Sequence, residues 1–169
     1  MNPLTLRRAV PSDVPTVLAF VRALAEYERL AEAAVATEAD FHAALFGDRP
    51  TAEVVLAEQS APDGAGAQAV GFALFFGTFS TFTGKPGLWL EDLFVVPEAR
   101  WQGVGRALLA HLAALALARG CARFEWSVLD WNADALAVYR ALGAEGMDGW
   151  TTQRLSGDAL HALAAQDAP

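Results

Sequence analysis

The chain has 169 residues, of which 54% are hydrophobic and 19% are charged, and its mean hydropathy is +0.26. This length predicts one domain spanning residues 1–169, and the low charge argues against a disordered chain. The 12 basic and 20 acidic residues give a net charge of -8. Such a surface would repel a nucleic-acid backbone and attract a small cationic molecule.

No segment indicates a membrane or metal protein. The longest apolar run, Ala107–Ala118, is interrupted by His111 and is short of the roughly 20 residues that cross a bilayer. The amino terminus lacks the order of a signal peptide. The single cysteine, Cys121, has no internal disulfide partner, and no Cys/His cluster has zinc-ligand spacing. We therefore expect a cytoplasmic protein without metal, membrane or nucleic-acid partners.

The first third of the chain reads as a strand followed by two helices. A short strand is expected at residues 4–10. Apolar residues at helical spacing predict an amphipathic helix over residues 12–30, with Ser12 as its N-cap. The sequence Thr37-Glu38-Ala39-Asp40 resembles a capping box, which would open a short helix ending at Gly47.

The rest of the chain alternates strand and helix patterns. Strands are expected at residues 53–57, 70–76, 88–95, 124–129 and 150–155, with a hairpin connection at 60–67. Helices are expected at residues 104–118, closed by Gly120, and 133–142, stopped by Gly143. This alternation predicts an α/β (α+β) fold with a mixed sheet flanked by helices.

The sharpest local motif is Arg100-Trp101-Gln102-Gly103-Val104-Gly105-Arg106, between a strand and a long helix. Its glycines leave room for main-chain N–H groups to close on an anion, and the helix dipole favours negative charge there. Residues 97–123 carry a net charge of +3, against -11 for the remainder. Positive charge is thus concentrated around a segment suited to phosphate.

Other interpretations of this motif remain open. It could be an ordinary flexible turn before a helix. A P-loop would need Gly-Lys-Ser/Thr, which the sequence lacks. A dinucleotide fingerprint would need a third small residue where Leu108 stands, although Glu125 lies near the expected downstream distance. A nucleotide-binding domain is therefore kept as an alternative.

Two acids, Glu91 and Asp92, interrupt the apolar strand at 88–95. Strand alternation predicts that they project from opposite faces. A carboxylate in such surroundings is costly to desolvate unless it is paired or opens onto a cleft, and burial would raise its pKa toward the range of a general base. The alternative is a pair of structural ion partners.

Together these motifs resemble the GNAT superfamily of N-acetyltransferases, and most closely its diamine acetyltransferase branch, with the spermidine/spermine and thialysine enzymes. The resemblance extends over nearly the whole chain, through the segments 24–28, 90–95, 100–106, 131–132 and 139–144. It implies the GNAT fold, a single twisted and mainly antiparallel mixed sheet, acetyl-CoA as donor and a homodimer.

The resemblance also implies roles for individual residues. The main chain of Leu93, Phe94 and Val95 would bind the pantetheine arm of the coenzyme. Further coenzyme contacts would come from Arg100, Trp101, Gln102, Gly103, Val104, Gly105, Arg106, Asn132 and Tyr139. Glu91 would be a base acting through water, and Tyr139 the general acid. The amine would be bound by Tyr27, Glu28, Glu91, Asp92, Glu125, Trp126, Ser127 and Asp148.

The expected function is therefore acetyl transfer from acetyl-CoA to a primary amine of a small cationic acceptor, such as a polyamine, a diamine or a thialysine-like amino acid. A non-catalytic acyl-CoA-binding module is the alternative, and it would have no use for Glu91 and Tyr139. Simpler roles stay open for two residues: Asn132 precedes a helix and could cap it, and Tyr139 could be a packing residue.

Overall fold

The computed structural model describes residues 3–60 and 66–167, which form two compact units divided after Ser127. Each unit is described by itself. Most of the predicted hairpin connection, residues 61–65, lies outside the described residues.

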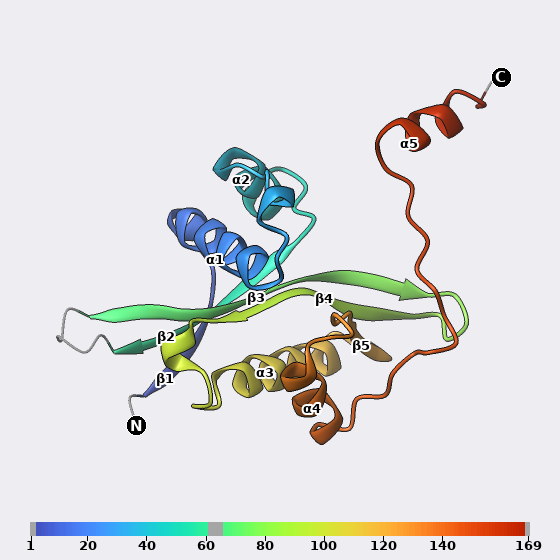
Figure 1. Cartoon of the computed structure of the whole chain (residues 1–169). Helices are drawn as coiled ribbons and strands as arrows, with labels where there is room; N and C mark the ends of the chain where they lie inside the picture. Colours follow the sequence, from blue (N-terminus) through green and yellow to red (C-terminus); the bar gives the residue numbers. More distant parts are fainter. Residues whose placement is uncertain (1–2, 61–65, 168–169) are drawn as a thin grey trace. The chain divides into compact units, whose positions relative to one another are not determined.

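The first unit is built on a five-stranded sheet with the order β1-β2-β3-β4-β5 (Figure 1). The strands are β1 (Leu4–Arg8), β2 (Glu53–Ser60), β3 (Ala67–Ser80), β4 (Lys85–Val95) and β5 (Arg123–Trp126). The first four pair antiparallel, and β5 is parallel to β4. The predicted mixed, mainly antiparallel sheet is confirmed, although β5 ends at Trp126 rather than at residue 129.

Helices cover both faces of this sheet. On one face lie α1 (Val14–Tyr27) and α2 (Glu38–Phe46), and on the other lies α3 (Val104–Ala118) (Figure 1). Short 3-10 turns, η1 (Pro11–Asp13), η2 (Ala31–Ala33) and η3 (Pro97–Ala99), join these elements. Arg100, which lies between β4 and α3, contacts both Val95 and Tyr27, so the end of β4, the end of α1 and the turn before α3 lie close together.

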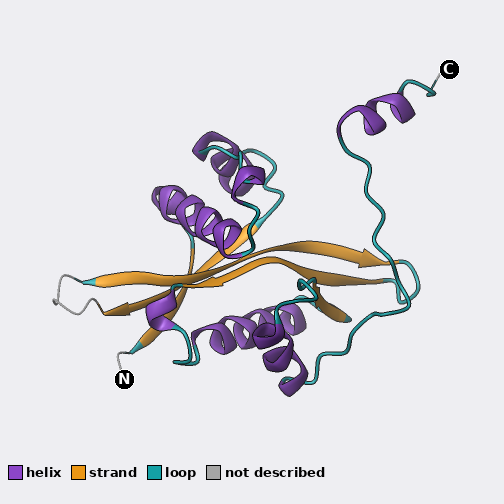
Figure 2. Cartoon of the chain, viewed as in Figure 1, coloured by secondary structure: helices purple, strands orange, loops and turns teal. Residues whose placement is uncertain are grey.

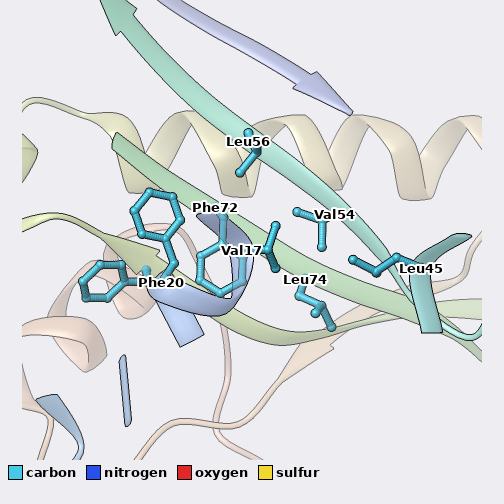
Figure 3. Close-up of a cluster of buried hydrophobic side chains, with 8 residues drawn as sticks. Val17, Phe20, Leu45, Val54, Leu56, Phe72 and Leu74 are labelled. Atoms are coloured by element: carbon cyan, nitrogen blue, oxygen red, sulfur yellow. The ribbon is translucent and has the colours of Figure 1, made fainter. Parts of the chain in front are cut away.

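Apolar side chains of α1, α2 and the strands fill the layer between them (Figure 3). The cluster consists of Val17, Phe20, Leu45, Val54, Leu56, Phe72, Leu74 and Phe94. On the α3 side, Leu108 and Leu112 are fully buried. The apolar residues at helical spacing therefore mark the buried faces of α1 and α3, as the sequence predicted.

Helix boundaries follow local chemistry. The capping box is confirmed, because the Thr37 hydroxyl accepts from the Asp40 N–H and the Asp40 carboxylate accepts from the Thr37 N–H at 2.8 Å. The prediction that Ser12 caps α1 is wrong. Residues 11–13 form η1 instead, and the Asp13 carboxylate binds the Val10 N–H at 2.8 Å and the Arg7 guanidinium at 2.6 Å.

The second unit contains α4 (Ala133–Ala141) and α5 (Gly157–Ala164). The predicted strand at 150–155 is wrong: this stretch is irregular, and Figure 2 draws the chain leading to α5 as loop. A strand needs a neighbour for its hydrogen-bond ladder, and none of the described residues pairs with this segment. None of the described residues of this unit is fully buried.

Within residues 3–60 and 66–167, no helix has the length and apolar character needed to cross a membrane. Over the same ranges, no three His, Cys, Asp or Glu side chains gather as a metal site would require.

Candidate active site

A β-bulge in β4 shapes the candidate site. Leu74 on β3 pairs with Asp92, but the next β3 residue, Phe75, pairs with Leu90. Glu91 is therefore an extra residue on β4 without a partner of its own on β3. A bulge of this kind changes the direction of the side chains next to it and breaks the simple alternation of a strand.

The bulge turns Asp92 toward the α1 face of the sheet. Asp92 lies opposite Leu74 and two residues before Phe94. Both of those side chains belong to the buried cluster that packs against α1. Asp92 is itself half-buried on this face.

Glu91 lies on the same face. Its Oε2 accepts a hydrogen bond from the indole N–H of Trp89 at 2.7 Å. Trp89 pairs with Phe76, which is two residues along β3 from Leu74 and so shares its α1-facing side. The prediction that Glu91 and Asp92 project from opposite faces is therefore wrong, because the bulge inserts Glu91 as an extra residue beside Asp92 and interrupts the alternation of the strand.

A third acid, Glu28, completes this group at the C-terminal end of α1. Burial, followed by the negative charges of Glu91 and Glu28, raises the pKa of Asp92 to about 6. Burial also raises the pKa of Glu28. We call Glu28, Glu91 and Asp92 the acidic cluster. Their mutual repulsion and the partial burial of Glu28 and Asp92 favour a bound cation, which would relieve both costs.

The Asp92 pKa leads to a prediction about stability. A raised pKa means that the folded state binds this proton more tightly than the unfolded chain, so the ionised carboxylate destabilises the fold as pH rises from about 4 to about 6. Asp92→Asn should therefore raise the free energy of unfolding at neutral pH by roughly 1–2 kcal/mol, after discounting for solvent screening. Urea denaturation at about pH 4 and about pH 7.5 measures the difference.

The exposed Asp48, in the turn after α2, provides the matched control. Asp48→Asn makes the same chemical change without burial and should show no such pH dependence. An equal effect of Asp92→Asn at both pH values would contradict the prediction.

The predicted amine-binding residues of β5 divide between the two faces. Glu125 pairs with Trp89 and so lies on the α1 face, where its carboxylate bonds the Arg123 guanidinium at 2.7 Å. Trp126 pairs with Leu90 on the opposite face, and its ring lies 4.9 Å from that of Phe124. Ser127 follows the end of β5 and is exposed. Of these three, Glu125 is the one that joins the side of the acidic cluster.

Beyond the bulge, one edge of β4 has no strand partner among the described residues, because β5 pairs only with Gly87–Leu90. The Val96 N–H donates to the Val70 carbonyl on β3 at 2.9 Å. Main-chain groups alternate along an antiparallel strand, so those of Leu93 and Val95 face the other, open edge. An extended ligand with amide groups, such as pantetheine, fits such an edge in the manner of an added strand.

The turn before α3 fits an anion. Its N-cap residue is Gly103, whose φ of +84° lies in the left-handed region and which has no side chain to satisfy the first N–H groups of the helix. These N–H groups and the helix dipole can bind a phosphate. Val104 is buried, so only its main chain can take part, whereas Arg106 is exposed. Buried Leu108 fills the place where a dinucleotide fingerprint needs a small residue.

Two other residues of the turn, Trp101 and Gln102, have local features that define its conformation. The Gln102 side-chain amide donates to the Glu98 carbonyl at 2.8 Å. Trp101 is 82% exposed and has a φ of +62°, which a residue with a Cβ rarely adopts. Backbone strain of this kind is often retained where function requires the conformation.

Replacing Trp101 with glycine tests the strain. Because glycine adopts positive φ without a steric penalty, Trp101→Gly should raise the free energy of unfolding by about 1 kcal/mol, less the entropy that glycine adds to the unfolded chain. Trp101→Ala removes the ring but keeps the Cβ, so it should bring no such gain. Chemical denaturation distinguishes the two variants, and equal stabilities would show that the φ value carries no strain.

The positive charge counted along the sequence is less concentrated in space. Arg119 follows the C-terminal end of the 15-residue helix α3, about 22 Å from the turn, and bonds Glu53 at 2.6 Å. Arg123 is paired with Glu125. The charge available near the turn is thus that of Arg106 and Arg100. The Arg100 side chain is directed to β4 and α1: its Nε–H donates to the Val95 carbonyl at 3.0 Å.

Three predicted site residues lie in the second unit. The Asn132 side chain caps α4, with its oxygen accepting from the Ala135 N–H at 3.2 Å, which confirms the capping interpretation. Tyr139 is half-buried on α4, and Asp148 is exposed in the irregular chain that follows. The contacts of these residues with coenzyme or amine remain predictions.

Trp89 contributes to the site, although the sequence pattern did not single it out. The hydrogen bond to Glu91 fixes the carboxylate that was singled out as a base. A signal was present, because residues two apart on a strand share a face and an indole N–H seeks an acceptor.

Comparison with known proteins agrees with this geometry. The acetyltransferase (GNAT) family matches residues 19–144. The thialysine N-epsilon-acetyltransferase of Sus scrofa is 36% identical, with 98% of this chain and 100% of the relative covered. The L-ornithine N5-acetyltransferase NATA1 of Arabidopsis thaliana is 31% identical, with 94% of this chain and 86% of the relative covered.

A solved structure, an integron cassette protein from the mobile metagenome of V. cholerae, has a TM-score of 0.77 and 25% identity, with 95% of this chain and 97% of that chain covered. The family match spans well over half of the chain, and the two full-length relatives exceed 30% identity. These findings confirm the resemblance noted in the sequence, and the chain belongs to the GNAT family of acetyltransferases as an N-acetyltransferase.

Proposed function

We propose that this N-acetyltransferase uses acetyl-CoA to acetylate a primary amine of a small cationic acceptor, such as a polyamine, a diamine or a thialysine-like amino acid. The observation that supports this most directly is the bulge in β4, which sets Glu91 and Asp92 on one face near Glu28 and beside the open edge of β4. The relatives that act on thialysine and ornithine support the same class of acceptor.

The proposed coenzyme site runs from the open edge of β4 to the turn before α3. Main-chain groups of Leu93 and Val95 would bind the pantetheine arm, and the N–H groups that follow Gly103 would bind the pyrophosphate, with Arg106 adding charge. When bound, acetyl-CoA supplies an activated thioester carbonyl. Main-chain N–H groups of β4 would polarise this carbonyl as negative charge develops on it.

The acidic cluster would bind the acceptor and deprotonate it. An alkylammonium has a pKa of about 10, so almost none of it is a free amine at neutral pH. Glu91, oriented by the Trp89 indole, would take the ammonium proton through a water molecule onto its carboxylate. The freed amine then attacks the carbonyl and forms the amide bond as the carbon–sulfur bond breaks. The Tyr139 hydroxyl would give its proton to the departing thiolate.

We further propose a homodimer. In the second unit, Met147, Trp150, Leu155, Leu160 and Leu163 are all at least half exposed. Large exposed apolar side chains are suited to an interaction site, and a second copy of the chain is the occupant that the family resemblance implies. Light scattering coupled to size-exclusion chromatography would measure the mass.

One assay tests the proposed function. The protein is incubated with acetyl-CoA and a panel of spermidine, a short diamine, thialysine, ornithine and neutral primary amides, while thiol release and product mass are followed. We expect acetylation of the cationic amines and none of the amides. Coenzyme binding without acetylation of any amine would instead favour an acyl-CoA-binding module, and preferential binding of NAD would favour a nucleotide-binding domain.

A further inference from the structure

Arg100 opens the turn before α3, yet its side chain contacts two other elements. Its Nε–H donates to the main-chain carbonyl of Val95 at 3.0 Å. The centre of its guanidinium lies 4.9 Å from the centroid of the Tyr27 ring and 5.7 Å from that of Phe94. Arg100 therefore joins the end of β4 to the last residue of α1.

These contacts satisfy the Val95 carbonyl and place the Arg100 guanidinium against two aromatic rings. The Val95 carbonyl faces the open edge of β4, where no strand among the described residues donates a hydrogen bond to it. A guanidinium at these distances from aromatic rings also gains a cation–π interaction. Phe94 extends the connection, because its ring lies 5.8 Å from Phe20 on α1. Arg100 thus lies in a layer of aromatic contacts between the sheet and the helix.

The contact with Tyr27 matters because of the residue that follows it. Glu28 is the C-cap of α1 and a member of the acidic cluster. The position of its carboxylate therefore depends on how firmly the last turn of α1 is held. Charged groups at this junction include Glu28 and Arg29, which directly follow α1, and Asp92 of β4, whose pKa is raised by the charge of Glu28. Arg100 is a cation that contacts both elements.

We propose that Arg100 is a positioning residue for the cationic acceptor: it holds the end of α1, with Glu28, against the end of β4, and so links the coenzyme turn to the amine site. This inference rests on the proposed function. It differs from the role that the family resemblance implies, in which Arg100 contributes to binding the coenzyme.

The two roles predict opposite changes in steady-state kinetics. If Arg100 positions the acceptor site, Arg100→Gln should raise the KM for the amine about tenfold, leave kcat at saturating amine within about threefold, and change the KM for acetyl-CoA less than about twofold. If Arg100 instead binds a phosphate directly, the KM for acetyl-CoA should rise and the KM for the amine should not.

Arg106→Gln is the comparison variant. Arg106 is exposed on the first turn of α3, near the proposed pyrophosphate site, and should affect the KM for acetyl-CoA alone. Arg100→Lys separates charge from geometry: a lysine keeps the charge but loses the Nε–H and the planar group, so it should restore the amine KM only in part. It also serves where Arg100→Gln fails to fold.

A double-mutant cycle completes the test. Tyr27→Leu removes the ring against which Arg100 lies and should itself raise the amine KM. In that background, Arg100→Gln should raise the amine KM by less than about twofold further, because the two residues act together. Full additivity, a change confined to the KM for acetyl-CoA, or a loss of kcat with both KM values unchanged would overturn the proposal. An inactive wild-type protein would instead refute the proposed function.

Discussion

Replacing Tyr139 with phenylalanine is expected to lower kcat by about 10²- to 10⁴-fold while leaving the Kd for coenzyme A nearly unchanged. The substitution removes the hydroxyl proposed to protonate the departing thiolate and keeps the aromatic ring. Tyr139 is half-buried on α4, so the retained ring should preserve the packing of that helix. Thiol release measures kcat, and calorimetric titration with coenzyme A measures the Kd.

A comparison with Tyr139→Leu separates the hydroxyl from the ring. If the hydroxyl is the acid, the phenylalanine variant should already show most of the loss in kcat, and circular dichroism should show that it retains its helix content. Unchanged turnover in Tyr139→Phe would remove the assigned acid role and leave Tyr139 as a packing residue of α4.

Glu91→Gln should lower kcat/KM for the amine by about 10²-fold near neutral pH, and the loss should shrink as pH rises. The direction of this pH dependence follows from the ionisation of the acceptor amine. An alkylamine with a pKa of about 10 becomes increasingly deprotonated in alkaline solution, so it depends less on a base. Glutamine keeps a side-chain oxygen that can accept the Trp89 N–H, so the geometry of the bulge should persist. A pH–rate profile of both proteins makes the measurement.

The exposed Glu38, in the first turn of α2, provides a matched control. Glu38→Gln removes the same charge without removing the proposed base, and its pH–rate profile should match that of the wild type. A pH-independent loss in Glu91→Gln would mean that Glu91 attracts the cation without accepting its proton.

Much of the fold could be predicted because local chemistry and tertiary structure agree. The capping box at Thr37, the helix over residues 104–118 and the glycine that ends it are specified by neighbouring residues, and each was found as expected. The strand expected at residues 150–155 is absent because local sequence and tertiary structure disagree there. Its β-favouring residues are a local signal, but a strand also needs a partner, which the sequence of the segment cannot specify.

The candidate site shows the same limit. The sequence identified Glu91 and Asp92 as unusual acids in an apolar strand, but it misplaced them, since a bulge depends on how β4 registers with β3. Likewise, the motif at 100–106 was visible as a turn, whereas the contact of Arg100 with Tyr27 joins residues far apart in the chain. The periodicity of a sequence predicts single helices and strands, but it does not predict which distant segments contact one another.

The open edge of β4 also bears on how the protein behaves in storage and purification. An unpaired strand edge is a template on which another chain can add, so the ligand-free protein has a place from which self-association can start. A pantetheine arm seated along that edge would cover it, and saturation at about 100 times the Kd would add about 2.7 kcal/mol to the free energy of unfolding. The donor substrate would thus act as the missing neighbour of the strand, protecting the enzyme between turnovers.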